Sequence, residues 1–359
     1  MSTSDGNCNV SASKSSNDDD DVTEKLQNMT TADEVDVSVC ANCGKEGSDI
    51  NNICNKCKQV KYCNAACKKK HRHKHKNDCE EHIKLVAERA AELHDEMLFR
   101  QPPPKEDCPI CFLVLPSLPT GSAWMPCCGK TICSGCSYAP VYDNQGNKVD
   151  EKKCAFCRVL CPTTEDKIKR MMKRIEANDA KAIYGMGCYY SEGRKGFPQD
   201  HTKALELWHR AAELGCAQSY NNIGVAYEYG EGVEIDKKKA RHYLELAAIE
   251  GQASARHNLG ALEENAGNMD RALKHHMISA RSGYTHSLNE IKEMYSKGHA
   301  SKDDYMKALH LCQTYLGEIK STQREKAAAF SEQYRYYSKL KLVLSLERAR
   351  VFFFKGEER

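Results

Sequence analysis

Several features that would place this chain in a common class of protein are missing from its sequence. Its 359 residues contain no apolar run near the ~20 residues of a transmembrane helix, and the first 21 hold no apolar core of a secretion signal. Phosphate-binding loops, nucleophile turns and His-Glu-x-x-His patterns are absent. A formal net charge of +3 excludes a globally basic nucleic-acid binder. We therefore expect an intracellular protein, cytoplasmic or nuclear, with neither membrane nor nucleic acid among its partners.

Cysteine, in contrast, is abundant and unevenly distributed. Of the 20 cysteines, 16 lie between Cys40 and Cys161. Because nothing indicates an oxidising compartment, paired Cys-x-x-Cys units predict zinc sites rather than disulfides. Zn²⁺ takes four thiolate or imidazole ligands in a tetrahedron. Two cysteines with two residues between them can bind one ion from a single tight turn. The cysteines outside this stretch are interpreted as ordinary, three of them as core residues of helices: Cys8, Cys188, Cys216 and Cys312.

The first cysteine block, residues 39–80, supplies eight candidate ligands, enough for two zinc ions. They are Cys40, Cys43, Cys54, Cys57, Cys63, Cys67, His75 and Cys79. The last four form two pairs with a spacing of four residues, which places both members of a pair on one face of a helix. His71 and His73 lie nearby, but only His75 has such a partner.

This spacing, with Tyr62 directly before Cys63 and the late His-x-x-x-Cys pair, resembles a MYND zinc finger over its whole length. In that family the ligands interleave. The resemblance therefore implies one ion on Cys40, Cys43, Cys63 and Cys67, and another on Cys54, Cys57, His75 and Cys79. Neither ion then has a local site, so folding is expected to depend on metal. MYND fingers bind short proline-containing peptides, and the resemblance implies that role here.

A basic run, residues 68–76, lies inside the first block. We interpret it as a solvated helix face whose positive charge offsets that of the thiolates. The alternative is a nuclear-import or nucleic-acid signal.

The second cysteine block, residues 105–162, contains three Cys-x-x-Cys pairs, which again imply two ions. Its order resembles that of a RING domain. The resemblance implies a first site of Cys108, Cys111, Cys133 and Cys136, and three ligands of a second site, Cys128, Cys154 and Cys157. Lys130 stands where the family usually has a histidine, and its ammonium cannot bind the ion. Cys127 and Cys161 are the alternatives for the missing ligand, and an incomplete second site is the third.

The RING resemblance also implies a role without a nucleophile. Such a domain binds a ubiquitin-conjugating enzyme through an apolar residue between the first two ligands and a cation just after the last. Ile110 and Arg158 occupy these positions here. Arginine suits the second position because its planar fork can bond two partners at once. The alternative is that Ile110 packs under the zinc loop and Arg158 is an ordinary surface residue.

Residues 163–317 are repetitive. Alanines recur at intervals of 36, 32 and 36 residues, at Ala204, Ala240, Ala272 and Ala308. That period predicts helix-turn-helix units stacked into a solenoid. In the unit that is most regular, we predict helices at 217–229 and 237–250, because Gly230 ends the first and Asp236 precedes the second.

Recurrent steps such as Ile223-Gly224 and pairs such as Ala247-Ala248 resemble the Sel-1-like subclass of tetratricopeptide-type repeats. The resemblance implies a concave face that binds a protein. Candidate contacts are the first-helix positions Tyr184, Asn221 and His257. The alternative is that these side chains pack between helices.

We therefore predict a mostly α chain, in which two small cross-braced zinc-binding modules precede an α-solenoid. The acidic residues 1–38 are predicted to be disordered. Residues 81–104 are predicted to form an amphipathic helix that ends at Pro102-Pro103-Pro104. Residues 318–359 are predicted to be a helix that caps the open end of the solenoid, in preference to a partner-binding or membrane helix.

The leading functional hypothesis is a RING-type ubiquitin ligase that recruits its substrate through the MYND finger and the repeats. The alternative is a non-enzymatic zinc-finger scaffold, for instance a transcriptional co-regulator. A SET-type methyltransferase, in which a MYND finger can be embedded, is rejected because an acidic tail and a helix flank the finger instead of a sheet-rich domain.

Overall fold

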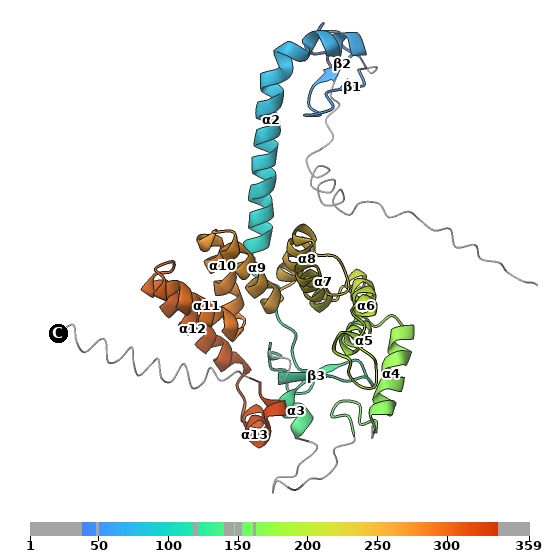
Figure 1. Ribbon diagram of the computed structural model, residues 1–359, viewed down its shortest axis with the longest axis vertical. Coiled ribbons are helices and arrows are strands. Elements are labelled where there is room, and N and C mark those ends of the chain that lie inside the picture. The colour runs from blue at the N-terminus through green and yellow to red at the C-terminus, as the bar shows by residue number, and fades with distance from the viewer. Residues whose placement is uncertain are drawn as a thin grey trace, which may run out of the picture. The chain divides into compact units, whose positions relative to one another are not determined.

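The computed structural model describes residues 38–47, 50–117, 121–139, 147, 153–160 and 163–336. They form a mostly helical chain (Figure 1) with two compact units, of which the first ends at Glu96 and the second begins at Met97. The mostly α fold is thus confirmed. The acidic tail up to residue 37, Cys8, Cys161 and residues 337–359 lie outside the described residues. Among the described residues, no helix has the length and apolar character to cross a membrane.

The first unit consists of a small cysteine-rich body and a long helix. Strand β1 (Asn52–Ile53) pairs antiparallel with β2 (Lys61–Tyr62), and α2 (Ala65–Phe99) follows. The side-chain oxygen of Asn64 accepts the Cys67 N–H at 2.8 Å, which caps the start of the helix. The basic run and the predicted amphipathic segment both belong to α2, so the predicted boundary at residue 80 falls inside one continuous helix. Several lysines of the basic run are exposed, in keeping with a solvated face: Lys69, Lys70, Lys74 and Lys76.

The second unit begins with the second cysteine block. Strand β3 (Ser122–Trp124) pairs antiparallel with β4 (Thr131–Cys133), with Ala123 opposite Ile132, and the short helix α3 (Ser134–Tyr138) follows directly. The Ile132 side chain is fully buried among the cysteines of this block.

A stack of antiparallel helices follows. Its elements are α4 (Thr164–Glu176), α5 (Ala180–Glu192), α6 (His201–Glu213), α7 (Ala217–Tyr229), α8 (Lys237–Ile249), α9 (Ala253–Asn265), α10 (Met269–Arg281), α11 (Thr285–Ser296) and α12 (Lys302–Ile319). The two helices predicted for the most regular unit match α7 and α8 to within one residue. Asp236 accepts N–H groups of Lys238 and Lys239, and Gly230 ends α7 at a φ of 78°.

Small residues allow neighbouring helices to approach closely. A Cβ atom added to Gly224 on α7 would lie 2.7 Å from Leu244 on α8. This explains the glycine in the recurrent Ile-Gly step, because any larger residue would push the two helices apart.

Helices α4 to α12 curve around the second cysteine block (Figure 1), and side chains of α4 and α12 join the two parts. Arg174 on α4 donates to the carbonyl oxygens of Pro126 and Cys127 at 2.8 and 3.3 Å. The Tyr315 hydroxyl on α12 accepts the Ser117 N–H at 2.7 Å. The second block therefore packs against the solenoid and is not a separate domain connected only by the chain.

The described part of the C-terminal segment packs on the end of α12, through Tyr336, and on the second block. Helix α13 (Thr322–Phe330) packs on α3 of the second block, and a short 3₁₀ helix (Glu332–Tyr334) follows it. Arg324 is fully buried at this contact and donates to the carbonyl oxygens of Val114 and Ile319 at 2.9 and 2.8 Å. Because Arg324 lies 210 residues after Val114 in the chain, the sequence alone could not indicate this docking position.

Candidate metal centres

The described cysteines and His75 gather into four clusters, in each of which four candidate ligand atoms lie within 4.8 Å of one another. The clusters are Cys40/Cys43/Cys63/Cys67, Cys54/Cys57/His75/Cys79, Cys108/Cys111/Cys133/Cys136 and Cys127/Cys128/Cys154/Cys157. The first two divide the MYND-like ligands as the resemblance implies. All fifteen candidate ligands named from the sequence therefore come together, and one further cysteine joins them.

The spacing of the sulfur atoms fits zinc. Four sulfurs at 2.3 Å from a tetrahedral ion stand about 3.8 Å apart, whereas a disulfide would bring two of them to about 2.05 Å. One distance from each cluster is 3.7 Å for Cys43–Cys63, 3.8 Å for Cys54–Cys79, 3.8 Å for Cys111–Cys133 and 3.9 Å for Cys128–Cys154. Every described cysteine is a free thiol. The donor set and its spacing are thus those of tetrahedral zinc sites.

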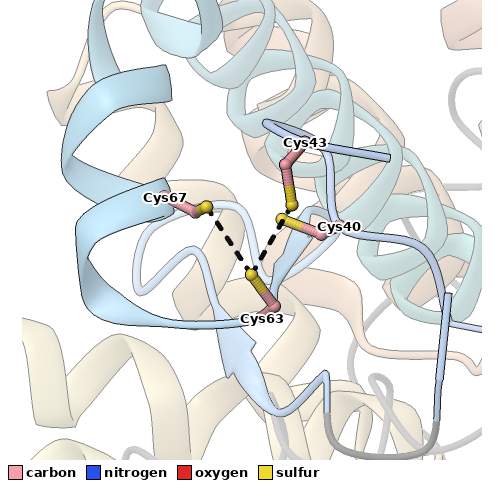
Figure 2. Close-up of side chains that lie close together, drawn as sticks. All are labelled: Cys40, Cys43, Cys63 and Cys67. Carbon is pink, nitrogen blue, oxygen red and sulfur yellow. Dashed lines mark hydrogen bonds between the residues drawn. The ribbon is translucent and has the colours of Figure 1, made fainter. Parts of the chain in front are cut away.

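In the first cluster, four sulfurs point toward one another from three parts of the finger (Figure 2). The Cys63 backbone lowers the pKa of the Cys40 thiol to about 6 by hydrogen bonding, whereas hydrogen bonding with the Cys67 sulfur raises the pKa of Cys63 to about 12. The shifts are opposite because backbone N–H groups stabilise the Cys40 thiolate, whereas hydrogen bonds with neighbouring sulfur atoms stabilise the protonated form of Cys63. A divalent cation at the centre would remove this conflict and allow all four to ionise.

The second cluster distinguishes the three histidines that the sequence places close together. His75 Nε2 lies 3.3 Å from Cys57 Sγ. His71 instead stacks on the His75 ring, with centroids 5.9 Å apart, and its Nδ1 is hydrogen-bonded to the Tyr62 hydroxyl at 3.3 Å. His73 is exposed on α2. The structure therefore brings only His75 into the cluster, and His71 supports its ring.

Four Cys-x-x-Cys turns, one from each cluster, share one backbone conformation. They begin at Cys40, Cys54, Cys108 and Cys154. In each, the N–H of the residue after the second cysteine donates to the carbonyl of the first at 2.8–2.9 Å. These residues have positive φ angles: Gly44 at 70°, Lys58 at 57°, Phe112 at 55° and Arg158 at 62°. A left-handed backbone costs a residue other than glycine about 1–2 kcal/mol. Three of the four turns therefore keep a large side chain where glycine would be less strained.

Two of these turns carry the residues that the RING resemblance singles out. Ile110 is 37% exposed at the tip of the third turn, and Arg158 is exposed at the left-handed position of the fourth. Phe112 is 78% exposed directly after Cys111. Both Ile110 and Arg158 are thus accessible in the described structure, whereas the alternative required Ile110 to be packed under the zinc loop.

The fourth cluster contains Cys127, for which the sequence left three alternatives open. Its sulfur lies 3.5 Å from Cys157 Sγ, while the Lys130 side chain is exposed. A tight turn in which Met125 O accepts the Gly129 N–H at 2.7 Å places Cys127 and Cys128 side by side. Cys161 lies outside the described residues.

The sequence did not reveal the side chains that hold this loop in place. Arg174 bonds the carbonyls of Pro126 and Cys127, as described above, and is itself fixed by Asp179 at 2.9 Å. In the third cluster, Arg324 Nη2 lies 3.9 Å from Cys111 Sγ. Both arginines come from helices far along the chain, so no motif near the cysteines indicates their role.

The predicted repeat-face residues lie between helices of the stack. Tyr184 packs in the core with Trp208 and Ile183. The Asn221 side-chain oxygen accepts from Asn258 at 3.3 Å, and His257 Nδ1 lies 3.2 Å from Ser287 Oγ. Burial also lowers the pKa of His257 to about 4. These contacts favour the alternative in which the three side chains join neighbouring repeats.

Comparison with known proteins agrees with these local features. Residues 40–79 match the family model of the MYND finger, and residues 180–216 and 217–252 each match that of the Sel1 repeat. The chain contains a MYND finger and Sel1 repeats. Both are protein-interaction modules, so the chain combines a zinc finger and Sel1 repeats in a protein-interaction architecture.

Two curated proteins are similar over short stretches. The ERAD-associated E3 ubiquitin-protein ligase component HRD3B of Arabidopsis thaliana is 32% identical over 103 residues, which are 28% of this chain and 16% of that protein. A putative sel1-like repeat-containing protein, L21, of Acanthamoeba polyphaga mimivirus is 37% identical over 79 residues, 22% of this chain and 15% of that one. The chain thus spans less than a fifth of the length of these relatives.

Solved structures with similar folds include a Sel1 repeat protein from Oxalobacter formigenes. It is 28% identical, with a TM-score of 0.40, and the match covers 45% of this chain and 67% of that one. The protective antigen c5321 of uropathogenic Escherichia coli is 25% identical with a TM-score of 0.37, over 53% of this chain and 43% of that one.

Proposed function

We propose that the protein is a zinc-dependent RING-type ubiquitin ligase. Its second cysteine block binds a ubiquitin-conjugating enzyme, and its MYND finger and Sel1 repeats recruit the substrate protein. The finger contributes a site for proline-containing peptides, as its family resemblance implies. The block itself acts by binding and orientation, since it needs no nucleophile of its own.

Each of the four clusters holds one zinc ion in this proposal, two in the MYND finger and two in the second block. A bound ion supplies a structural cross-link, and four protein ligands leave it no open position for water. Cys127 completes the fourth site in place of the histidine that Lys130 replaces. Ile110, Arg158 and the proposed ligands then form a rigid surface, because each turn is fixed by its ion.

The observation that carries the ligase proposal is the position of Arg158. It is exposed, it follows the last ligand of its turn, and it has a φ of 62°. An exposed guanidinium at this position can bond carbonyl oxygens of two partners at once. Lys58 occupies the same position in the MYND finger, with a φ of 57°, and offers a matched comparison.

The test is self-ubiquitination with a panel of conjugating enzymes. We expect zinc-dependent activity that is lost in Ile110→Ala and in Arg158→Gly and retained in Lys58→Gly. Both glycine variants relieve strain, so loss of activity in one alone reports the missing guanidinium rather than misfolding. If the fully metallated protein is inactive with every enzyme of the panel, the ligase proposal fails.

A specific observation favours a second candidate, a non-enzymatic scaffold. One side of the second block is already covered by the chain itself, since α13 packs on α3. The contact is close, because a Cβ atom on Gly135 would lie 2.9 Å from the backbone nitrogen of Arg324. A block that serves to brace the solenoid would have such contacts. In that case Arg158→Gly would change neither ubiquitin transfer nor partner binding.

A further inference from the structure

The end of α2 and the residues after it pack against α8, α9 and α10 of the solenoid. The surface of these three helices that they cover is called the groove. Leu98 is fully buried among residues of α8 and α9, which include Leu244, Ala255 and Leu259. Phe99 packs on the ring of His275 on α10, with centroids 4.7 Å apart. From there the chain runs inside the curve of the helices to β3 (Figure 1). The groove that would receive a partner is therefore occupied by this chain's own Leu-Phe pair.

The following residues extend the contact along the groove. Pro103 lies against the α8–α9 turn, where a Cβ atom on Gly251 would approach its ring to 3.2 Å. The Gln101 side-chain oxygen accepts from Arg281 Nη1 at 2.8 Å. Glu106 pairs with Lys181 on α5 at 2.8 Å. Residues 98–106 thus make the kind of contacts that a separate bound peptide would make. The prolines restrict the backbone of this segment and make it stiff.

Cations of α10 lie beside this segment. Lys274 lies 5.6 Å from the Phe99 ring centroid, and Arg281 bonds a neutral amide. Arg271 lies 5.2 Å from the same ring and is paired with Glu263 at 3.4 Å. The Arg256 side chain on α9 is 1% exposed, and its three nitrogens have no hydrogen-bond partner among the described residues. Glu263 on the same helix is already bonded to Arg241 and Asn268, at 2.6 and 2.7 Å.

A buried guanidinium without an acceptor is costly, and hydrogen bonds between guanidinium and carboxylate are stronger than those to a neutral amide. A peptide with carboxylates beside its aromatic residue would therefore fit Lys274 and Arg281 better than Arg100 and Gln101 do.

We propose that the groove on α8, α9 and α10 is the peptide-binding site of the solenoid and that residues 98–104 occupy it as an internal ligand. Its partner in trans is a protein segment in which a Leu-Phe pair is followed by acidic residues and prolines. The proposal rests on the protein-binding role of the repeats within the proposed function and is independent of ubiquitin transfer.

Fluorescence anisotropy of the full-length, zinc-loaded protein tests this. The probe is a labelled peptide of residues 97–106 carrying Arg100→Asp and Gln101→Glu, and the comparison peptide has the native sequence. We expect the acidic probe to bind about tenfold more tightly than the native peptide, the equivalent of one charge-assisted contact. Arg281→Ala should abolish that preference, whereas Lys238→Ala, which removes an exposed cation at the other end of α8, should leave it intact.

Variants of the internal ligand provide the second arm. Phe99→Ala should raise the affinity for the probe, because it weakens the competing segment, and Gln101→Ala should do so with little risk to folding because it truncates only one polar contact. Absence of probe binding to the wild type and to both variants would overturn the proposal, as would binding that Arg281→Ala does not change. Probe binding by a protein that transfers no ubiquitin would support this inference and count against the ligase proposal alone.

Discussion

Arg324 on α13 donates a hydrogen bond of 2.9 Å to the carbonyl oxygen of Val114, which lies 210 residues earlier in the chain. The same guanidinium reaches Leu113 O at 3.3 Å and is fully buried. Through this contact the second cysteine block and the C-terminal end of the solenoid form one folded body. Stability, metal binding and partner binding in this unit are therefore coupled.

Arg324→Ala should destabilise the second unit strongly. The substitution leaves buried carbonyls without a donor, and hydrogen bonds to a charged group contribute about 1.5–3 kcal/mol each to stability. We expect a loss of at least about 3 kcal/mol in the free energy of unfolding, measured by urea denaturation of the zinc-loaded protein. Lys297→Ala, which removes a cation from an exposed pair with Glu293, is the control and should leave the free energy of unfolding nearly unchanged. Equal losses in the two variants would contradict this role of Arg324.

Removal of zinc should weaken the solenoid without unfolding it. From the sequence alone, chelation is expected to unfold residues 40–161 and spare the repeats. Because Arg174, Tyr315 and Arg324 join the second block to the helices, we now expect chelation also to lower the melting temperature of the solenoid, by several degrees for each ~2 kcal/mol of lost contact.

Circular dichroism with and without a chelator measures both quantities. Most of the helical signal at 25 °C should survive. An unchanged melting temperature would mean that the block does not brace the solenoid, and loss of most of the signal would mean that the repeats cannot fold without it.

Acid should destabilise the solenoid between pH 6.5 and pH 4. Burial, aided by the charge of Arg256, lowers the pKa of His275 to about 3, and burial lowers that of His276 to about 4. Both folded-state values lie below the unfolded value near 6.5, so the stabilisation is complete above pH 6.5 and is lost as the pH falls toward the folded-state value. The fully buried His275 ring should cost about 2 kcal/mol between pH 6.5 and pH 5. His276 should cost less, because Glu264 Oε1 lies 2.8 Å from its Nε2 and stabilises the protonated ring.

Urea denaturation at a series of pH values checks this dependence. His275→Phe keeps an aromatic ring against Phe99 and should remove the larger part of the pH dependence, whereas His299→Phe, at an exposed position, should not alter it. A wild-type stability that stays constant from pH 6.5 to pH 5 would show that these rings accept protons within the folded state.

Glycine at the left-handed position of a zinc turn should increase stability. Lys58→Gly removes a side chain at a φ of 57° and should stabilise the MYND finger by about 1 kcal/mol, since only the strain is lost. The measurement is the zinc concentration, set with a competing chelator, at which the finger unfolds. A requirement for more zinc in the variant than in the wild type would argue that the Lys58 side chain makes a contact worth more than the strain.

Much of the zinc chemistry could be predicted because its signals are local. The spacing of His75 to Cys79 places this pair on one face of a helix, and α2 carries both. The same expectation for Cys63 and Cys67 is wrong, because α2 begins at Ala65 and Cys63 lies directly after β2. The repeat helices were predictable for the same reason, since Gly230 and Asp236 mark their ends within a few residues.

The features that could not be predicted depend on contacts between distant parts of the chain. Nothing near Cys127 distinguishes it from Cys161, and the turn that brings it to Cys157 is held by Arg174 from α4. A proline triplet after an amphipathic helix is typical of a stiff linker, and only packing reveals that Leu98 fills a space beside Leu244.

The zinc content of the protein tests the central claim most directly, because the claim requires a second cysteine block with two complete sites. Native mass spectrometry should find four zinc ions in the wild type and three in Cys127→Ser, with four retained in Cys188→Ser, a cysteine of the solenoid. Three ions in the wild type, or four in Cys127→Ser, would show that Cys127 does not complete the fourth site.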